Sequence, residues 1–292
     1  MPDIDPGMYK FYSIFEWTER KNPLALLEAY WREFEGVTDV CLIIKTYVDN
    51  FTPDRKQEID NAIRMLKKRL QLTHYAPLKL YRGLMDRHQI YRFHKSFDCF
   101  VSAHRGEGWG IPQMEALLMG RPIISTNAGG VHEYLIDNIH GKLLPYELVG
   151  IDENTRNRQW YTPDQKWAEV DKQALRSAMH FAYENRELMA EMGKNGQTLV
   201  KTVFSLEAVG KKMRERLESI ANDPYKVERQ EPVANNTDVL RVGDIIEPAQ
   251  VVEVPDPNGI GKGSKFTIPP LVKKNRIKVN YNAVPEVPTD DA

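Results

Sequence analysis

The sequence contains little cysteine, no long apolar run and no excess of either charge. Its 292 residues include two cysteines, Cys41 and Cys99, and both lie in apolar stretches of the kind that forms buried strands. Isolated thiols in such surroundings behave as small apolar side chains. We therefore expect two buried free cysteines, rather than a disulfide or half of a metal site.

The lack of long apolar runs bears on where the protein works. No stretch approaches the roughly 20 apolar residues that a membrane-spanning helix requires. The N-terminal sequence MPDIDPG also lacks the basic and then apolar build of a signal peptide. We expect a cytoplasmic protein, with peripheral attachment to a membrane as a further option.

The charges nearly cancel. Lys and Arg number 40, Asp and Glu number 41, and the formal net charge is −1. A chain without a basic excess has no global electrostatic attraction for nucleic acid. We therefore expect no nucleic-acid partner, and any anion site must be local.

What the sequence does contain is an ordinary globular composition with an alternating pattern. Hydrophobic residues make up 41% and charged residues 28%, which is enough for a core of normal size. Between residues 10 and 145, short β-rich runs alternate with amphipathic stretches. Strands are predicted at 11–15, 40–46, 78–82, 98–102, 122–126 and 142–145, and helices at 23–34, 54–72, 86–95, 111–119 and 131–136. The alternation predicts an α/β fold, a Rossmann-like parallel sheet with helices on both faces.

The C-terminal part differs in composition. After a polar loop at 150–160, apolar residues at helical spacing predict two closing helices packed on the sheet, at 171–184 and 205–220. Nine of the 18 prolines then follow residue 222, with no tryptophan. We expect an N-terminal lead at 1–9, one domain at 10–220 and an extended or weakly ordered tail at 221–292. Short β-like pieces in the tail are at 238–246, 249–254 and 276–284, and a flexible turn, GIGKGS, is at 259–264.

The strongest candidate site is glycine-rich and follows a predicted strand. Gly106, Gly108 and Gly110 allow a tight turn, and Pro112 suits the first turn of the next helix. The unpaired amides at such a helix start, together with the positive end of the helix dipole, form an anion site. A diphosphate would fit it.

Two carboxylates flank this helix start. Glu107 lies in the loop and Glu115 in the second turn, eight positions later. An ionised carboxylate accepts hydrogen bonds from two adjacent hydroxyls, as a sugar or ribose offers. The alternative is that Glu115 only favours the helix terminus electrostatically and that Glu107 is a solvated loop residue.

The whole segment RGEGWGIPQMEALLMGRPIISTNAGGVHEYL resembles the glutamate-pair signature of family 4 glycosyltransferases. These are retaining enzymes of the GT-B fold, also called glycosyl transferases group 1, and the signature lies in their C-terminal domain, which binds the nucleotide sugar. FYSIFEWTERKNPLALLEAY is similar to that domain's first strand and helix, VCLIIKT to its second strand, and LYRGLMDRHQIYRFHKSFDCFVS to the segment before the signature. The resemblance covers about residues 10–220.

The resemblance implies a role for each matching residue. Glu107 would be the catalytic residue facing the donor sugar, and Lys21 would bind the diphosphate. Glu115 would hold the ribose hydroxyls. The backbone of Gly108, Trp109 and Gly110 would contact sugar and diphosphate, and Gly83, Leu84 and Met85 would hold the base.

The first loop departs from the family pattern. Where most members carry an arginine five residues before the lysine, this chain has Glu16, which would repel a diphosphate. We expect Glu16 to turn away or to pair with Arg20, itself an alternative phosphate ligand. Lys45 could supply the missing positive charge, although it could equally be a snorkelling surface lysine.

Four further residues have an open assignment. His104 could touch substrate, although a buried supporting histidine is the favoured interpretation. Gly129, Gly130 and Glu133 match another glycine-rich helix start, where a structural turn and a ligand contact are both open.

The resemblance implies a hexosyltransferase that retains anomeric configuration and uses a UDP- or GDP-linked sugar, with no cofactor and no metal. The acceptor would be a glycan, a lipid-linked molecule or a protein. The family's N-terminal acceptor domain has no counterpart in this sequence. We therefore expect a separate acceptor-domain chain or a fragment. The other reading is a non-catalytic subunit that binds or senses the nucleotide sugar.

Overall fold

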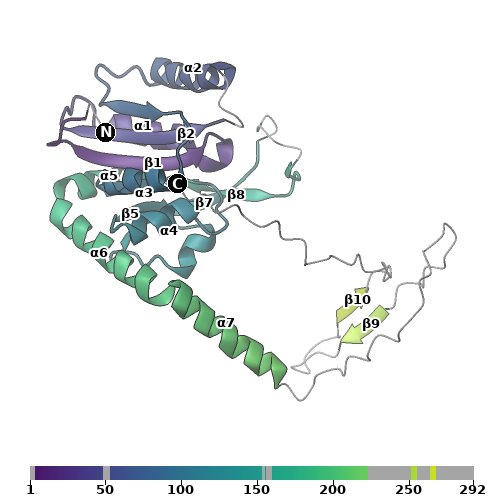
Figure 1. Ribbon diagram of the computed structural model, residues 1–292. Coiled ribbons are helices and arrows are strands. Elements are labelled where there is room, and N and C mark those ends of the chain that lie inside the picture. The colour runs from purple at the N-terminus through teal and green to yellow at the C-terminus, as the bar shows by residue number, and fades with distance from the viewer. Residues whose placement is uncertain are drawn as a thin grey trace, which may run out of the picture. The chain divides into compact units, whose positions relative to one another are not determined.

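The structure is a computed structural model that describes residues 4–48, 53–152, 155, 160–222, 251–254 and 264–267. The chain divides into two units, residues 1–223 and 224–292, which are taken separately below (Figure 1). The predicted boundaries of the domain at 10 and 220 stay predictions.

The first unit is built on a six-stranded sheet in which every neighbouring pair is parallel. Its strand order is β3-β2-β1-β4-β5-β6. The strands are β1 (Tyr9–Glu16), β2 (Val40–Tyr47), β3 (Leu78–Tyr81), β4 (Cys99–Ser102), β5 (Ile123–Thr126) and β6 (Gly141–Leu144). The predicted parallel sheet is confirmed. Because the chain builds outward from β1 in one direction and from β4 in the other, the order reverses between these two strands. Ligands of open α/β sheets bind at such a reversal, beyond the carboxyl ends of the strands.

Helices cover both faces of this sheet (Figure 1). They are α1 (Pro23–Glu33), α2 (Pro53–Leu70), α3 (Arg87–Lys95), α4 (Ile111–Leu118), α5 (Lys172–Glu184), α6 (Arg186–Val203) and α7 (Leu206–Ala221), with two 3-10 turns, η1 (Glu19–Lys21) and η2 (Gly129–Glu133). One core cluster joins α1, α2 and α5 to the sheet, the other joins α3 and α4, and α6 contributes to both. Successive residues of β2 enter opposite clusters, which explains why that strand is apolar without interruption. Both cysteines are buried and free, as predicted.

Several elements differ from the sequence-based expectation. The helix expected at 131–136 is the short turn η2. An antiparallel pair, β7 (Tyr146–Gly150) with β8 (Lys166–Val170), was not predicted, nor was α6. Glycines interrupt the pattern of α6, and they are needed there. Gly193 and Gly196 face Gly120 and Leu117 with no room for a β-carbon, so α6 can approach α4 closely.

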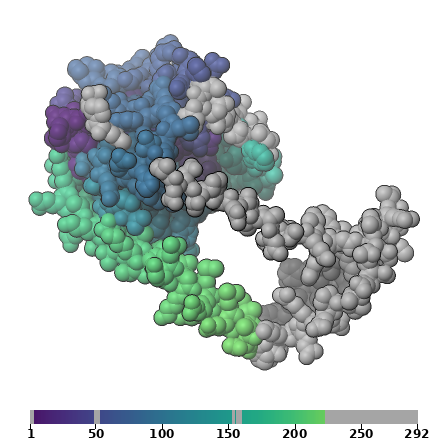
Figure 2. Space-filling view, in the orientation of Figure 1, coloured from purple at the N-terminus to yellow at the C-terminus, as the bar shows by residue number. Residues whose placement is uncertain are grey.

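The second closing helix, α7, does not pack on the sheet, and that prediction is wrong. None of its residues is buried, and its apolar side chains are 38–89% exposed. They are Leu206, Val209, Met213, Leu217 and Ile220. Figures 1 and 2 show α7 in green, extending away from the layers of the sheet. The spacing of apolar residues correctly predicted an apolar stripe along this helix. Periodicity alone does not show whether such a stripe is covered by another part of the protein.

The second unit contains one described pair of antiparallel strands, β9 (Val251–Val254) and β10 (Ser264–Thr267). The predicted piece at 249–254 includes β9. The pieces at 238–246 and 276–284, and the turn at 259–263, lie outside the described residues. Across the part of the chain that the structure describes, no helix is long and apolar enough to cross a membrane.

Candidate functional site

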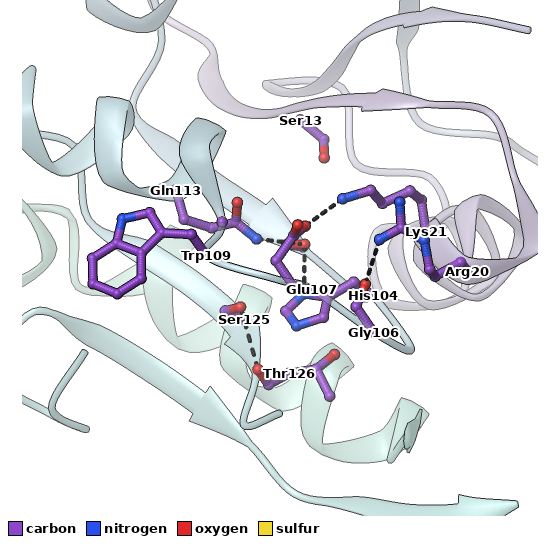
Figure 3. Close-up of polar contacts among 12 residues, drawn as sticks. Ser13, Arg20, Lys21, His104, Gly106, Glu107, Trp109, Gln113, Ser125 and Thr126 are labelled. Atoms are coloured by element: carbon purple, nitrogen blue, oxygen red, sulfur yellow. Dashed lines mark hydrogen bonds and ion pairs between the residues drawn. The ribbon is translucent and has the colours of Figure 1, made fainter. Parts of the chain in front are cut away.

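Two loops meet where the strand order reverses, one after β1 and one after β4. The backbone N–H of Arg105 donates to the carbonyl of Arg20 at 2.7 Å. The guanidinium of Arg20 donates in turn to the carbonyl of Gly106 at 2.7 Å (Figure 3). Ser13, on β1, donates its hydroxyl to Val101, on β4, at 2.7 Å. These bonds fix the two loops against each other. The guanidinium of Arg20 thus binds a backbone carbonyl of the protein itself.

The side chains of Lys21 and Glu107 form an ion pair across the two loops (Figure 3). The lysine side chain is 14% exposed and the glutamate 11%. Burial lowers the pKa of Lys21, and the hydrogen bond and charge of Glu107 oppose that shift. Residues that are 86 positions apart are thus joined at the edge of the sheet where a ligand would sit.

The helix that follows Glu107 begins with free amides. Gly110 is the N-cap of α4 and has φ of 82°, a conformation that glycine adopts without strain. No acceptor in the described structure receives a hydrogen bond from the amides of Gly108, Trp109, Gly110 or Ile111. Four unpaired N–H groups, the arrangement that an anion site at a helix start requires, therefore lie in the segment that directly follows Glu107.

Three aromatic side chains, Trp109, Tyr134 and Phe204, pack together beside this turn. The hydroxyl of Tyr134 donates to the carbonyls of Trp109 and Gly110, at 3.0 and 3.1 Å. The indole of Trp109 packs on Tyr134 and Phe204, with ring centroids 5.3 and 5.7 Å apart. Figure 3 shows this indole on the far side of Glu107 from Lys21. Trp109 can therefore meet a ligand at this turn through its backbone, while its ring supports the turn.

Gly129 and Gly130 lie against the Glu107 loop. A β-carbon on Gly129 would collide with the backbone of Glu107, and one on Gly130 with the backbone of Gly108. The amide of Gly130 also donates to the carbonyl of Glu107 at 3.3 Å. Of the two assignments left open by the sequence, this geometry favours the structural turn. Glu133, in the same segment, is exposed.

His104 is fully buried, and both of its ring nitrogens are occupied. Nδ1 lies 2.9 Å from the hydroxyl of Ser102, and Nε2 lies 3.0 Å from the carbonyl of Ala128. A carbonyl only accepts, so Nε2 carries the hydrogen and Nδ1 accepts from Ser102. Burial lowers the pKa of His104, which suits this neutral form. His104 has no free nitrogen for a substrate, in agreement with the favoured interpretation.

Glu115 projects from α4 and is 18% exposed. Its two carboxylate oxygens face two side chains of α3, Arg87 and His94. Oε1 is 3.8 Å from the guanidinium of Arg87, and Oε2 is 3.6 Å from Nε2 of His94. The loop predicted to hold the base follows β3. There Gly83 and Leu84 are exposed, the latter by 80%, while Met85 packs against the core.

For Lys45 and for Glu16 the structure removes one of the two alternatives that the sequence left open. Lys45 is 6% exposed, so the alternative of a snorkelling surface lysine is wrong. It lies on β2 with its ammonium group 5.6 Å from the ring centre of Tyr47. Glu16 forms no ion pair with Arg20 in the structure as described, and Arg20 donates instead to the carbonyl of Gly106. Burial raises the pKa of Tyr47, and the charge of Glu16 adds to that shift. The charge of Glu16 also acts on Lys21, where it raises the pKa against the larger lowering effect of burial.

The sequence did not predict a set of contacts from Arg105 and Glu169 that joins β8 to the two loops. The carboxylate of Glu169, on β8, accepts a hydrogen bond from the guanidinium of Arg105 at 2.6 Å and one from the side-chain amide of Asn22 at 3.1 Å. The guanidinium of Arg105 also reaches the carbonyl of Glu19 at 3.2 Å and lies 4.6 Å from the ring centre of Trp167. Because Arg105 and Glu169 are 64 residues apart, no local signal identifies the pair.

No group of three or more His, Cys, Asp or Glu side chains in the described ranges is arranged to hold a metal ion.

Residues 64–147 match the model of the family Glycosyl transferases group 1. The matched segment contains Glu107 and Glu115, whereas Lys21 lies before it. A comparison with curated proteins finds no match.

Solved structures resemble the fold more widely. HepE from Anabaena, in complex with UDP and glucose, is 17% identical, with a TM-score of 0.52 over 73% of this chain and 49% of that one. Sucrose-phosphate synthase from Thermosynechococcus elongatus is 18% identical, with a TM-score of 0.54 over 75% and 47%. The C-terminal domain of LpcC, a glycosyl transferase group 1 protein from Francisella tularensis, is 20% identical, with a TM-score of 0.50 over 69% and 88%. This chain thus covers about half the length of HepE and of the synthase. The six-stranded unit has the fold of one Rossmann-like half of a GT-B structure.

Proposed function

We propose that this chain is the donor-binding, C-terminal half of a retaining family 4 glycosyltransferase. The observation that carries the proposal is the Lys21–Glu107 pair beside four free amides, at the reversal of the strand order. A nucleoside diphosphate sugar has the chemistry that such a site takes. Its diphosphate suits a lysine and a helix start, and its hydroxyls suit a carboxylate. The match of residues 64–147 to group 1 glycosyl transferases supports the same assignment.

Each part of the donor has a proposed contact. The diphosphate lies between Lys21 and the amides of residues 108–111, with Lys45 as a second cation on β2. The donor sugar faces Glu107, and the ribose faces Glu115. The base lies against the backbone of residues 83–85. A uridine nucleotide is the first donor to test, because HepE was solved with UDP, and a guanosine nucleotide is the second.

The proposed reaction needs only these groups on the donor side. The acceptor hydroxyl oxygen forms a bond to the anomeric carbon, on the face that the diphosphate occupies, as the bond from that carbon to the diphosphate oxygen breaks. Lys21 and the amides stabilise the negative charge that develops on the departing diphosphate, without reorganising as it forms. The departing phosphate oxygen takes the acceptor's proton. Configuration is retained, and neither a cofactor nor a metal ion is required.

The acceptor side belongs to the proposal as well. The described sheet is one half of a GT-B fold. We place the acceptor, a glycan, a lipid-linked molecule or a protein, on the second domain of such a fold. The two buried thiols suit a reducing compartment, so we place the reaction in the cytoplasm, with peripheral membrane attachment where the acceptor is a lipid.

Binding and transfer are tested separately. Thermal-shift measurements with UDP, GDP and their glucose and mannose conjugates test donor binding. A ligand at 100 times its dissociation constant adds about 2.7 kcal/mol to the free energy of unfolding. Transfer is then followed with radiolabelled sugar, using this chain alone and together with any protein that co-purifies. Absence of stabilisation by every nucleotide would overturn the proposal.

A second function is favoured by Glu16. Its charge acts on Lys21, and a carboxylate beside a diphosphate weakens binding by repulsion. The second function is a subunit that binds a nucleotide sugar without transferring it. Glu16→Arg discriminates between the two. A more than tenfold gain in diphosphate affinity, with no transfer by the unaltered chain and its partner, would support the non-catalytic subunit.

A further inference from the structure

A buried chain of polar groups runs from the sheet to Glu115. The hydroxyl of Tyr12, on β1, lies 2.9 Å from Nδ1 of His94, on α3. Both residues are fully buried. On its other side, Nε2 of His94 lies 3.6 Å from Oε2 of Glu115. That distance is too long for a hydrogen bond, and Nε2 has no hydrogen-bond partner within the described structure.

The proton positions follow from the two neighbours. Burial holds the pKa of Tyr12 well above its ordinary value, so its hydroxyl keeps its hydrogen. A lone pair on Nε2 would face the negative carboxylate, whereas an N–H there would be attracted by it. His94 therefore carries its hydrogen on Nε2 and accepts the Tyr12 hydrogen on Nδ1. Each donor in the chain points towards Glu115.

The surroundings of His94 hold the ring in this orientation. The ring of Tyr12 meets it edge-on with centroids 5.5 Å apart, and the ring of Phe100 lies 6.1 Å away. Glu115 is the only ionisable carboxylate within ion-pair distance of His94 in the described part of the chain. Arg87, which is 76% exposed, faces the other oxygen of Glu115 from the solvent side.

We infer that Tyr12 and His94 are positioning residues that orient the Glu115 carboxylate towards a ribose. The inference rests on the proposed function, in which Glu115 accepts hydrogen bonds from both ribose hydroxyls. With one oxygen facing His94 and the other facing Arg87, both within ion-pair distance, the carboxylate favours one setting of its last torsion. Two lone pairs then remain in a defined plane for the two hydroxyls. A ligand that draws Glu115 inward would close the 3.6 Å gap, as catalytic contacts often tighten on binding.

The test compares ligands with and without the ribose hydroxyls. Calorimetry gives the affinity for UDP or GDP, whichever the unaltered chain binds, and for its 2′,3′-dideoxy analogue. Tyr12→Phe removes one hydroxyl and keeps the ring, and His94→Leu removes both nitrogens. We expect each change to weaken ribonucleotide binding about fivefold and to leave the dideoxy analogue within twofold. His94→Gln, which can return an N–H towards Glu115, is expected to recover most of the loss.

A matched control comes from a second buried histidine. His140 is 5% exposed and accepts a hydrogen bond from the amide of Ile136 at 3.2 Å. His140→Leu is expected to lower thermal stability without any ligand-dependent difference. If His94→Leu does not fold, Tyr12→Phe and His94→Gln carry the comparison.

The outcomes separate this inference from the function on which it rests. Glu115→Gln should weaken the ribonucleotide and spare the dideoxy analogue. If it does, while Tyr12→Phe and the His94 variants weaken both ligands equally or neither, the positioning role is overturned and the proposed function stands. If the unaltered chain binds no nucleotide, or Glu115→Gln shows no ribose dependence, the assignment of Glu115 is wrong and the positioning role falls with it.

Discussion

Gly130 lies so close to the carbonyl of Gly108 that a β-carbon has no room between them. The turn η2 therefore presses directly on the loop that carries Glu107. Gly130→Ala should destabilise the unit by about 1 to 3 kcal/mol, because an added methyl group in a tight contact forces the backbone apart. Urea unfolding followed by circular dichroism measures this.

Gly210→Ala is the matched control for that change. Gly210 lies in α7 with open space around its β-position. An alanine there should leave stability unchanged or raise it by up to about 1 kcal/mol, since alanine favours a helix over glycine. Equal midpoints for Gly130→Ala and the unaltered protein would show that η2 does not brace the loop.

Stability should fall as the solution becomes acidic, partly because of His104. Burial lowers the pKa of His104 in the folded state below its ordinary value of about 6.5 in the unfolded chain. The unfolded chain therefore binds a proton that the folded state does not, from about pH 6.5 down to the lower folded pKa. Within that window the group removes up to about 1.4 kcal/mol of stability per pH unit.

His104→Gln should flatten this pH dependence between pH 7 and pH 5, whatever it does to stability at pH 7. The exposed His132→Gln serves as the control and should keep the original slope. Free energies of unfolding at each pH provide the measurement, and an unchanged slope in His104→Gln would count against the assignment.

The apolar stripe of α7 should contribute little to the stability of the first unit. Leu217 is 63% exposed, whereas Leu117 on α4 is fully buried. Leu117→Ala should cost about 2 to 5 kcal/mol, and Leu217→Ala should stay within about 0.5 kcal/mol of the unaltered protein. A comparable loss for both would mean that α7 is covered in solution.

Two lysines should share the diphosphate. Lys21 follows β1 and Lys45 lies on the neighbouring strand β2, and burial lowers the pKa of each. Lys21→Ala and Lys45→Ala should weaken nucleoside diphosphate binding by similar factors, with much smaller losses for the nucleoside. If Lys45→Ala leaves the diphosphate affinity unchanged, Lys21 binds the diphosphate without help from Lys45. The interpretation that Glu16 weakens the donor site would then become stronger.

Much of the fold could be predicted because its signals are local. Residues 40–44 of β2 form an unbroken apolar run, and α4 begins where the N-cap glycine is followed two residues later by proline. The position of Glu107 could also be inferred, since it lies between a strand and a helix start. Its partner Lys21 was reached only through the family resemblance.

What could not be predicted depends on contacts between distant segments. The bond from Arg105 to Glu169 requires β8. The loop before β8 does not specify how that strand is aligned with its neighbour, so the pair could not be predicted. The burial of Lys45 depends on the segments that pack around the carboxyl end of β2, which the sequence of the strand does not specify. The periodicity of α7 is that of a packed helix, and only the three-dimensional arrangement shows its stripe exposed.

The central claim is that Glu107 binds the donor sugar and Glu115 binds the ribose of the same nucleotide sugar. Calorimetric titration of UDP and UDP-glucose, or of the guanosine pair if those bind, into Glu107→Ala and Glu115→Ala tests it most directly. Each lost charge-assisted hydrogen bond should cost about 1.5 to 3 kcal/mol. The account predicts that Glu115→Ala weakens both ligands, and that Glu107→Ala weakens the nucleotide sugar more than the nucleotide. Equal effects of the two substitutions on both ligands would contradict it.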